Sequence, residues 1–501
     1  MTPLDLEDPP VAAPAPKAER RHVQKHYETA IEDTLPFSHK LAYGLGQVCN
    51  NLLAASLGCM MIVLNLGLGM DPAAIGTIMF IARMWDAFTD PVMGYISDHT
   101  KSRWGRRRPY ILGGAIASGV VFALMWQLPA GHSSSFYFWF FTGGTLLFYL
   151  SYTVFATPFI ALGYEATPDY HERTRLLGFG NFMGQTVWLA VPWFYKFMQN
   201  DRLFANSVEG AKTLAIIVGA LVVVFGVMPA IFIRERMKSV AQAEADLGPT
   251  QGLWKHTLDF FKGFFIALKF RPFLLLCAAT FLVFNGFMAI SGFSSYVIIY
   301  YIFGGNQDHG ATYMGLFGTI SSLCTFGIIA LVTWLSTKIG KRIAFFWATG
   351  ISVVGYGIKW FCYQPAHPWM LLLPAPLIAF GLGGLFTTVG AMTADVCDLD
   401  ELRNGSRREG LFGAIYWWMV KLGMSVAFLA GGYLLNATGF DVALGAAQTE
   451  RTLFLLRVFD CGVPVVTSLL AIWAVAGYKV TEQSAYEVRA ELEKRRGKTL
   501  A

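Results

Sequence analysis

The feature that most constrains the fold is a series of about 12 apolar segments, each of roughly 20 residues, between residues 40 and 480. The chain has 501 residues, of which 54% are hydrophobic and only 14% are charged. A segment of this length crosses the hydrocarbon core as a helix, because lipid offers no hydrogen-bond partners to an open backbone. The sequence therefore predicts an all-α membrane protein of about 12 transmembrane helices.

Lysine and arginine residues gather in alternate short loops between these segments. The clusters are Lys101–Arg108, Arg173–Arg175, Lys338–Arg342 and Arg403–Arg408. Basic residues in short loops mark the cytoplasmic side of a membrane protein. We therefore expect a multi-pass protein of the plasma (inner) membrane with both termini in the cytosol. Because these clusters account for the basic charge, we expect no nucleic-acid partner.

A long polar segment in the middle of the chain divides the apolar segments six and six. The pattern predicts a disordered cytosolic tail at 1–39, six-helix bundles at 40–233 and 272–480, a linker at 234–271 and a second cytosolic tail at 481–501. Apolar residues recur at helical spacing from Trp254 to Leu268, so we expect a helix at the membrane interface within the linker. The sequence STKIGKR after the eighth segment repeats part of SDHTKSRWGRRR after the second, and such related halves are typical of transporters.

Two carboxylates, Asp86 and Asp90, lie inside the second apolar segment, four residues apart and therefore on one helical face. Each ionised group at the bilayer centre costs about 2.5 to 3.5 kcal/mol on insertion scales, so both need partners inside the protein. Arg83 lies near the same stripe and is a candidate coupling residue. Paired carboxylates can bind sodium through hard oxygen ligands, or share a proton because their charges repel. A purely structural network of Asp and Arg is the alternative.

Three more charges lie in the apolar segments of the second half. We expect Arg457 and Asp460 to form a mutual ion pair in the twelfth segment, and Lys359 to extend its amine towards the membrane interface. We assign no function to these residues.

Three stretches of sequence carry a resemblance to a known family. They read ARMWDAFTDPVMGYISDHTKSRWGRRRP at Ala82–Pro109, PFIALGYEATPDYHERTR at Pro158–Arg175 and ADVCDLDELRNGSRREGLFGA at Ala394–Ala414. Together they resemble the glycoside-pentoside-hexuronide:cation symporters of the major facilitator superfamily, for which melibiose permease is the model. The resemblance implies the major facilitator fold in two six-helix halves. It also implies symport of a sugar or glycoside with sodium or protons by alternating access, with no catalytic residues and no cofactor.

The resemblance assigns roles around the acidic pair. Asp86 and Asp90 match the cation site of the family, and Thr153 in the fourth segment matches a threonine of that site. Thr89 stands where the model has an asparagine, so an oxygen is kept but sodium selectivity is not implied. Lys421, a lone amine in the eleventh segment, matches a lysine near the carboxylates and is expected to couple the two halves. No metal beyond a coupling sodium ion is expected.

Polar and aromatic residues on the first, fifth and eleventh segments are candidates for substrate binding. They are Gln47, Asn51, Asn181, Gln185, Trp188 and Trp417. Where the model permease uses charged groups for its sugar, this chain has Asn51, Ala156 and Asn181. Amides still exchange hydrogen bonds with hydroxyls, and tryptophan faces stack on sugar rings, so a glycoside is the expected small-molecule partner.

The loop after the second segment is a candidate cytosolic gate. Asp98 can form ion pairs there with the basic cluster Arg103, Arg106, Arg107 and Arg108. Such pairs would hold the outward-open arrangement and break on inward opening. A role in membrane topology alone is the alternative.

Other functions stay open on the sequence alone. A sodium-coupled carrier of lysophospholipids or other amphiphiles is the nearest, because related facilitators share the acidic pair and the lysine, and the sugar-binding charges are missing here. An intramembrane enzyme is disfavoured, since HERTR at His171 lacks the second histidine of a zinc protease and no nucleophile elbow appears. Only flux measurements separate a transporter from a sensor of the same fold.

Overall fold

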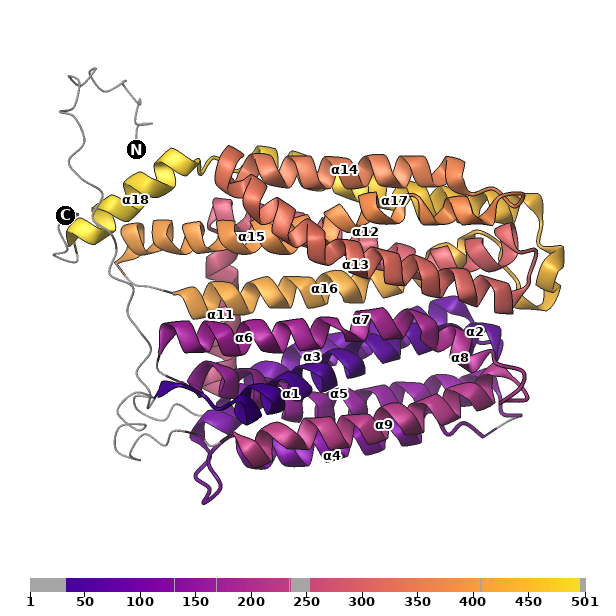
Figure 1. Cartoon of the computed structure of the whole chain (residues 1–501), viewed down its shortest axis with the longest axis horizontal. Coiled ribbons are helices and arrows are strands. Elements are labelled where there is room, and N and C mark those ends of the chain that lie inside the picture. The colour runs from indigo at the N-terminus through magenta and orange to yellow at the C-terminus, as the bar shows by residue number, and fades with distance from the viewer. Residues whose placement is uncertain are drawn as a thin grey trace.

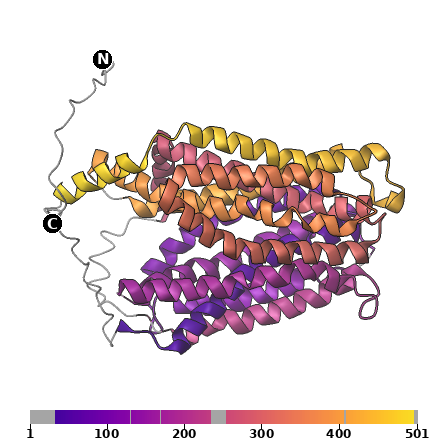
Figure 2. The same ribbon diagram turned by 45° about the horizontal axis from the view of Figure 1, so that its top comes forward.

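The computed structural model describes residues 33–129, 131–167, 169–233, 235, 253–405 and 408–495, and all regular elements in these ranges are helical. Figure 1 shows long, nearly parallel helices in two bundles that lie side by side. The first half of the chain forms one bundle and the second half forms the other, as Figure 2 confirms from a second angle.

The first half contains six long helical segments. They are α1 (Phe37–Met60) with α2 (Ile62–Leu66), α3 (Pro72–His99), α4 (Arg108–Met125), α5 (Ser134–Glu165), a broken segment of α6 (Tyr170–Gln185), α7 (Val187–Ala190), η2 (Val191–Trp193) and α8 (Phe194–Met198), and α9 (Ser207–Phe232). Helix α11 (Leu253–Leu268) lies between the halves in sequence, so the helix predicted in the linker is present. It leaves Leu258 and Phe265 exposed, whereas Phe264 and Ala267 are buried. The side chains of Trp254 and Phe261 lie outside the described residues.

The second half contains six more long segments. They are α12 (Arg271–Tyr296) with the π-helical η3 (Val297–Ile302), α13 (Gln307–Ile339), α14 (Lys341–Cys362), α15 (Ala375–Asn404) preceded by η4 (Pro368–Leu372), α16 (Glu409–Ala437), and α17 (Glu450–Ala476) preceded by η5 (Val442–Ala447). Helix α18 (Glu482–Arg495) follows in the region predicted as a tail.

The number of spans agrees with the hydropathy pattern. Within the described residues, nine helical segments are long and apolar enough to cross a bilayer. Three more have a comparable length but carry charges or helix breaks: α3, α14 and the segment from Tyr170 to Met198. The prediction of about 12 spans in an all-α membrane protein is confirmed.

The two ends of the bundle differ in their loops. One end, here called the basic end, carries the loop 100–107, Gly340 and the helices α11 and α18, on the left of Figure 1. The opposite end carries α2, α8 and the loops 67–71 and 303–306. Residues 1–32 of the predicted tail lie outside the described residues. Helix α1 already begins at Phe37, inside the predicted tail, and Lys40 binds Glu172 with 2.6 Å between nitrogen and oxygen.

Helices α3 and α16 join the two halves almost backbone to backbone. A Cβ atom added to Gly76 of α3 would lie 2.4 Å from the carbonyl oxygen of Phe428. One added to Gly432 of α16 would lie 2.3 Å from the carbonyl oxygen of Pro72. Small residues allow helices to approach this closely in membranes. The contact brings the charged middle of α3 next to the middle of α16.

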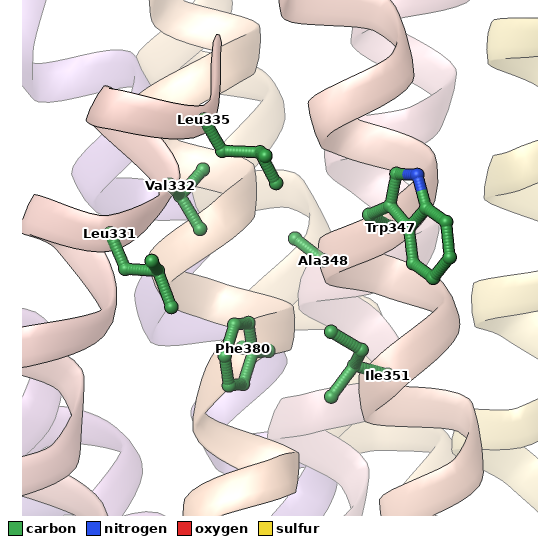
Figure 3. A pocket seen from close by; sticks show the side chains of 7 residues that line it. All are labelled: Leu331, Val332, Leu335, Trp347, Ala348, Ile351 and Phe380. Atoms are coloured by element: carbon green, nitrogen blue, oxygen red, sulfur yellow. The ribbon is translucent and has the colours of Figure 1, made fainter. Parts of the chain in front are cut away.

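The outer surface is apolar, as expected of helices in lipid. A groove with a cavity volume of about 250 Å³ opens between α13, α14 and α15. Figure 3 shows that its walls are apolar side chains, among them Leu331, Leu335, Trp347, Ile351 and Phe380. Leu331 and Trp347 are exposed there, so lipid tails fit this face.

Candidate cation and substrate site

The acidic pair lies on α3, whose start is fixed by local sequence. Asp71 caps the helix by accepting a hydrogen bond from the Ala74 amide at 2.9 Å, and Pro72 occupies the first turn. Farther along the helix, Asp86 is fully buried, whereas the side chain of Asp90 is 36% exposed. The pair therefore has one sealed carboxylate and one that the protein covers only in part.

Threonines surround the two carboxylates with further oxygens. The Thr153 hydroxyl of α5 lies 3.0 Å from Oδ1 of Asp86 and 3.2 Å from Oδ1 of Asp90. Thr89 Oγ1 lies 3.2 Å from Thr153 Oγ1 and donates to the Asp86 carbonyl oxygen at 3.2 Å. A hydroxyl has a single proton, so Thr153 donates to one carboxylate at a time and keeps lone pairs for a cation.

Thr157 belongs to this cluster, although the sequence analysis missed it. Its hydroxyl lies 3.3 Å from Oδ1 of Asp90. The available clue was its spacing, since it follows Thr153 by one helical turn on α5 and so shares its face.

Lys421 of α16 completes the cluster from the other half of the protein. Its Nζ lies 2.7 Å from Oδ2 of Asp86 and also binds Oδ2 of Asp90. The lysine thus places a positive charge between the two carboxylates, where an external cation would have to bind. Because the ammonium and such a cation need the same oxygens, their binding is mutually exclusive by electrostatics.

Arg83 is buried next to the pair but is a poor partner for it. Its Nη1 lies 3.8 Å from Oδ2 of Asp86, and its guanidinium sits 4.9 Å from the centroid of the Tyr149 ring. The Nε atom of Arg83 has no hydrogen-bond partner among the described residues. Arg83 is held mainly by the face of the Tyr149 ring. The short ion pairs of this cluster are those that Lys421 forms with Asp86 and Asp90.

Three of the predicted substrate residues lie together. The Asn51 amide donates to the Gln47 carbonyl oxygen at 2.9 Å, and Trp188 Nε1 donates to Asn51 Oδ1 at 3.3 Å. A Cβ atom on Gly184 would lie 2.6 Å from Asn51 Nδ2, so the glycine allows α6 to approach α1 here. Trp188 is 38% exposed, which leaves ring surface free.

Among the residues that the structure describes, no side-chain hydrogen bond joins the other predicted substrate residues to this group. Asn181 and Gln185 are exposed on α6. Trp417 of α16 is 58% exposed and stacks on Phe386, with 6.1 Å between ring centroids. The structure therefore presents a polar set on the first half and an aromatic set on the second half.

A hydrogen bond that the sequence analysis did not foresee joins the helix α1 of the polar set to the helix α5 of the acidic cluster. Tyr152, the residue before Thr153 on α5, donates to Asn50 Oδ1 of α1 at 2.8 Å. Asn50 is in turn adjacent to Asn51. The bond thus lies one residue along the chain from a member of each candidate site.

The loop at the basic end forms ion pairs inside the first half. Arg107 binds Asp98 and Glu165, each at 2.8 Å, and Arg106 also binds Glu165. Arg108 donates to the Ala230 carbonyl oxygen at 2.6 Å, while Arg103 is exposed. Glu165, which the sequence analysis did not select, is the shared carboxylate of this network.

Contacts at the opposite end join one half to the other. Lys196 of α8 forms an ion pair with Asp308 at the start of α13. The Gln199 amide donates to Gln307 Oε1 at 2.7 Å, and Trp193 Nε1 donates to Thr319 Oγ1 at 2.9 Å. These polar contacts hold the two halves together at that end.

The prediction for the charges of the second half is wrong. Asp460 pairs with Lys359 at 2.9 Å, and Ser294 and Tyr363 also donate to it. Arg457 instead lies between two aromatic rings and donates to the Tyr301 hydroxyl at 3.0 Å. Lys359 is 1% exposed, so it does not extend to the interface. Asp460 lies on the buried face that α17 packs against α14, so its partner is Lys359 of α14.

Comparison with known proteins places this architecture in a family. The model of the family described as MFS/sugar transport protein matches residues 42–482. The chain belongs to this family. As a member of the MFS/sugar transport family, it is a transporter and not an enzyme, and the predicted relation to glycoside:cation symporters is confirmed.

Individual relatives and a solved structure support the same assignment. An isoprimeverose transporter of Lactiplantibacillus pentosus is 25% identical, with 93% of each chain covered. The sodium-dependent lysophosphatidylcholine symporter 1 of Mus musculus is 22% identical, with 95% of this chain and 92% of that protein covered. A solved D-xylose-proton symporter matches with a TM-score of 0.56 at 16% identity, over 87% of this chain and 97% of that chain. The last match confirms the major facilitator fold of this MFS protein.

Proposed function

We propose that the protein is a symporter that carries a sugar or glycoside together with a sodium ion or a proton by alternating access. The observation that carries the proposal is the ammonium of Lys421, from one half, bound to Asp86 and Asp90 of the other half. A contact of this kind depends on charge, so a cation that binds the carboxylates changes how the halves are held.

The cation enters by way of Asp90 in this proposal, because its carboxylate is the exposed member of the pair. Sodium would take carboxylate oxygens of Asp86 and Asp90 and hydroxyl oxygens of Thr153, Thr157 and Thr89. A proton would need only one carboxylate. Either cation neutralises the charge that holds Lys421 and so weakens the link between α3 and α16. The lysine acts as the internal competitor that couples cation binding to movement.

A neutral glycoside is the proposed substrate. Gln47 and Asn51 offer amide groups to hydroxyls, and Trp188 and Trp417 offer ring faces, with Asn181 and Gln185 as further polar groups on α6. The isoprimeverose transporter among the relatives handles a ligand of this chemical class by its name. Amides suit an uncharged ligand because they exchange hydrogen bonds without leaving an ion unpaired.

An amphiphile is the second candidate. The exposed aromatic pair of Trp417 and Phe386 offers apolar surface in the second half, which would suit an acyl chain. A relative named as a sodium-dependent lysophosphatidylcholine symporter aligns with 95% of this chain. The two candidates differ in the polarity of the ligand that the second half must accept.

The topology completes the proposal. We place the basic end in the cytosol of a cell whose plasma (inner) membrane holds the protein, with bundles at 40–233 and 272–480. Asp98 with Arg103, Arg106, Arg107 and Arg108 would form the cytosolic gate region. The polar contacts from Lys196 to Asp308 and from Gln199 to Gln307 would then close the outer side. The arrangement observed would be the one closed to the outside. The Asp98–Arg107 pair is formed in it and lies within the first half, so in this proposal that pair shapes the gate region and does not itself break on inward opening.

The test is uptake by the purified protein in proteoliposomes under a sodium gradient, a proton gradient or no gradient. A panel of labelled neutral glycosides is compared with lysophosphatidylcholine. Accumulation of a glycoside above equilibrium under one gradient supports the proposal and identifies the ion. Accumulation of the lysolipid alone replaces the glycoside by the amphiphile, and accumulation of neither under any gradient contradicts symport of both classes.

A further inference from the structure

A second cavity lies far from the acidic cluster, at the basic end of the second half. Its volume is about 420 Å³, and it is a partly open cavity where the start of α12 and the ends of α15 and α17 meet α18. This volume is within the range of about 300 to 1,000 Å³ typical of small-ligand pockets. Helix α18 packs against α15 and supplies Ser484, Ala485 and Val488 as one wall. In Figure 1, α18 lies beyond the bundle at this end.

The cavity carries an excess of positive charge. Arg271, Arg403 and Lys479 line it, and the carboxylate in its wall is Asp395. Both oxygens of Asp395 lie 2.7 Å from Nζ of Lys341, so this carboxylate is already neutralised from outside the cavity. Among the described residues, none of the three lining cations forms an ion pair. Three exposed cations that line one cavity, whose carboxylate is already paired with Lys341, favour an anionic ligand.

The surroundings of the cavity are partly apolar and face the membrane. Leu275 of α12 and Val480, which follows α17, are among the lining residues. On α12 and α17, Leu274 is 44% exposed and Trp473 is 75% exposed, as expected of side chains in contact with lipid. The cavity therefore lies at the ends of spanning helices, where the head groups of a leaflet are found, and beside a surface that contacts acyl chains.

We propose that this cavity binds a phosphate group, presented by an anionic phospholipid of the leaflet at the basic end. Guanidinium groups bind phosphate oxygens in pairs, and an ammonium adds a point charge, so Arg271, Arg403 and Lys479 form a chemically suitable set. Leu275 and Val480 then contact the glycerol and the first methylenes of the lipid. Because α18 forms a wall, the bound head group joins the C-terminal helix to the bundle.

Native mass spectrometry of the detergent-purified full chain tests the proposal. The protein is mixed with equal amounts of phosphatidylglycerol and phosphatidylcholine, and the ratio of the two lipid adducts is measured. We expect a several-fold preference for phosphatidylglycerol that falls to about one in the double variant Arg271→Gln/Lys479→Gln. The matched control is Lys338→Gln, which removes an exposed cation at the same end but outside the cavity. Equal adducts in the wild type, or an unchanged preference in the double variant, would overturn the proposal.

Two further arms separate a lipid from a soluble source of the phosphate group. Glycerol 3-phosphate is added as a competitor, and the thermal midpoint is measured with each ligand. Loss of the lipid adduct and a matching rise of the midpoint with glycerol 3-phosphate would show that the phosphate group alone is bound. No competition, with a midpoint raised only by phosphatidylglycerol, assigns the site to the whole lipid. Equal midpoints of the wild type and the variants in phosphatidylcholine show that the substitutions leave the fold intact.

Discussion

Two clusters of lysine and aspartate lie inside the membrane-spanning part of this protein, and they differ in what they join. Lys421 binds Asp86 and Asp90 across the boundary between the halves, and Asp90 is 36% exposed. Lys359 and Asp460 both belong to the second half and are 1% and 0% exposed. The first cluster, here called the reachable cluster because Asp90 is partly exposed, joins the two halves, whereas the second, here called the sealed pair, lies within one half.

The difference in exposure distinguishes two roles for a lysine–aspartate ion pair inside the membrane. Removing two charges from water requires several kcal/mol per ion, which only good geometry and added hydrogen bonds offset. Lys359 and Asp460 meet this condition with Ser294 and Tyr363, so their pair can remain closed. The cluster at Lys421 has a partly exposed carboxylate, and we propose that a cation from outside replaces its lysine. In our proposal, partial exposure, rather than the presence of buried charge, distinguishes the coupling cluster from the structural one.

The largest effect on stability is expected from breaking the sealed pair. Asp460→Ala leaves Lys359 as an unpaired buried cation and should lower the free energy of unfolding by about 3–5 kcal/mol. Thermal unfolding in detergent measures the loss. The double variant Lys359→Met/Asp460→Leu removes both charges and should recover most of the stability and retain cation-coupled uptake. A double variant that folds but no longer couples would show that the sealed pair has a role in transport.

Removing the lysine of the reachable cluster should have a different result. Lys421→Met leaves Asp86 and Asp90 facing each other, so sodium or protons should take the place of the ammonium. We expect tighter binding of the coupling cation by on the order of tenfold, about 1.4 kcal/mol, together with loss of coupled uptake. The thermal midpoint as a function of sodium and of pH measures this. A midpoint no more sensitive to either cation than that of the wild type would contradict the competition.

A smaller effect is expected from the hydroxyl that touches both carboxylates. Thr153→Val removes one oxygen from the cluster and should weaken cation binding by about 1–2 kcal/mol, whereas Thr153→Ser should retain it. The cation concentration for half-maximal uptake is the measurement. Thr145→Val on the same helix is the control, because its hydroxyl donates to the carbonyl oxygens of its own helix. Equal shifts in the two valine variants would remove Thr153 from the site.

The smallest effect should come from Thr157, which the sequence analysis missed. Its single contact with Asp90 is long, so Thr157→Val should weaken cation binding by about 0.5–1 kcal/mol. The same uptake titration measures it. If Thr157→Val weakens cation binding more than Thr153→Val does, the cation lies nearer to Thr157 than to Thr153, contrary to the arrangement proposed here.

Features that lie on one helix were readable from the sequence. The spacing of Asp86 and Asp90 predicted a shared face, and the apolar segments predicted the spans, because both depend only on helical periodicity and on the bilayer. The helix in the linker followed from the same periodicity. These predictions needed no knowledge of how the helices pack.

Features that depend on contacts between helices were not readable in the same way. Periodicity suggested that Arg457 and Asp460 pair on one helix, whereas in the structure Asp460 forms its ion pair with Lys359 of another helix. The position of Lys421 between the carboxylates depends on the close contact of Gly76 and Gly432 with the facing backbones. Its role came from a family resemblance and not from the spacing of residues.

The central claim is that the reachable cluster couples a cation to the substrate, and Asp90→Asn tests it most directly. Proteoliposomes are loaded with the transported substrate to measure exchange at equilibrium, and separate ones are given a sodium or proton gradient to measure accumulation. The account predicts that Asp90→Asn keeps exchange but loses accumulation under both gradients. Accumulation at the wild-type level in this variant would contradict the account, because the exposed carboxylate would then not hold the coupling cation.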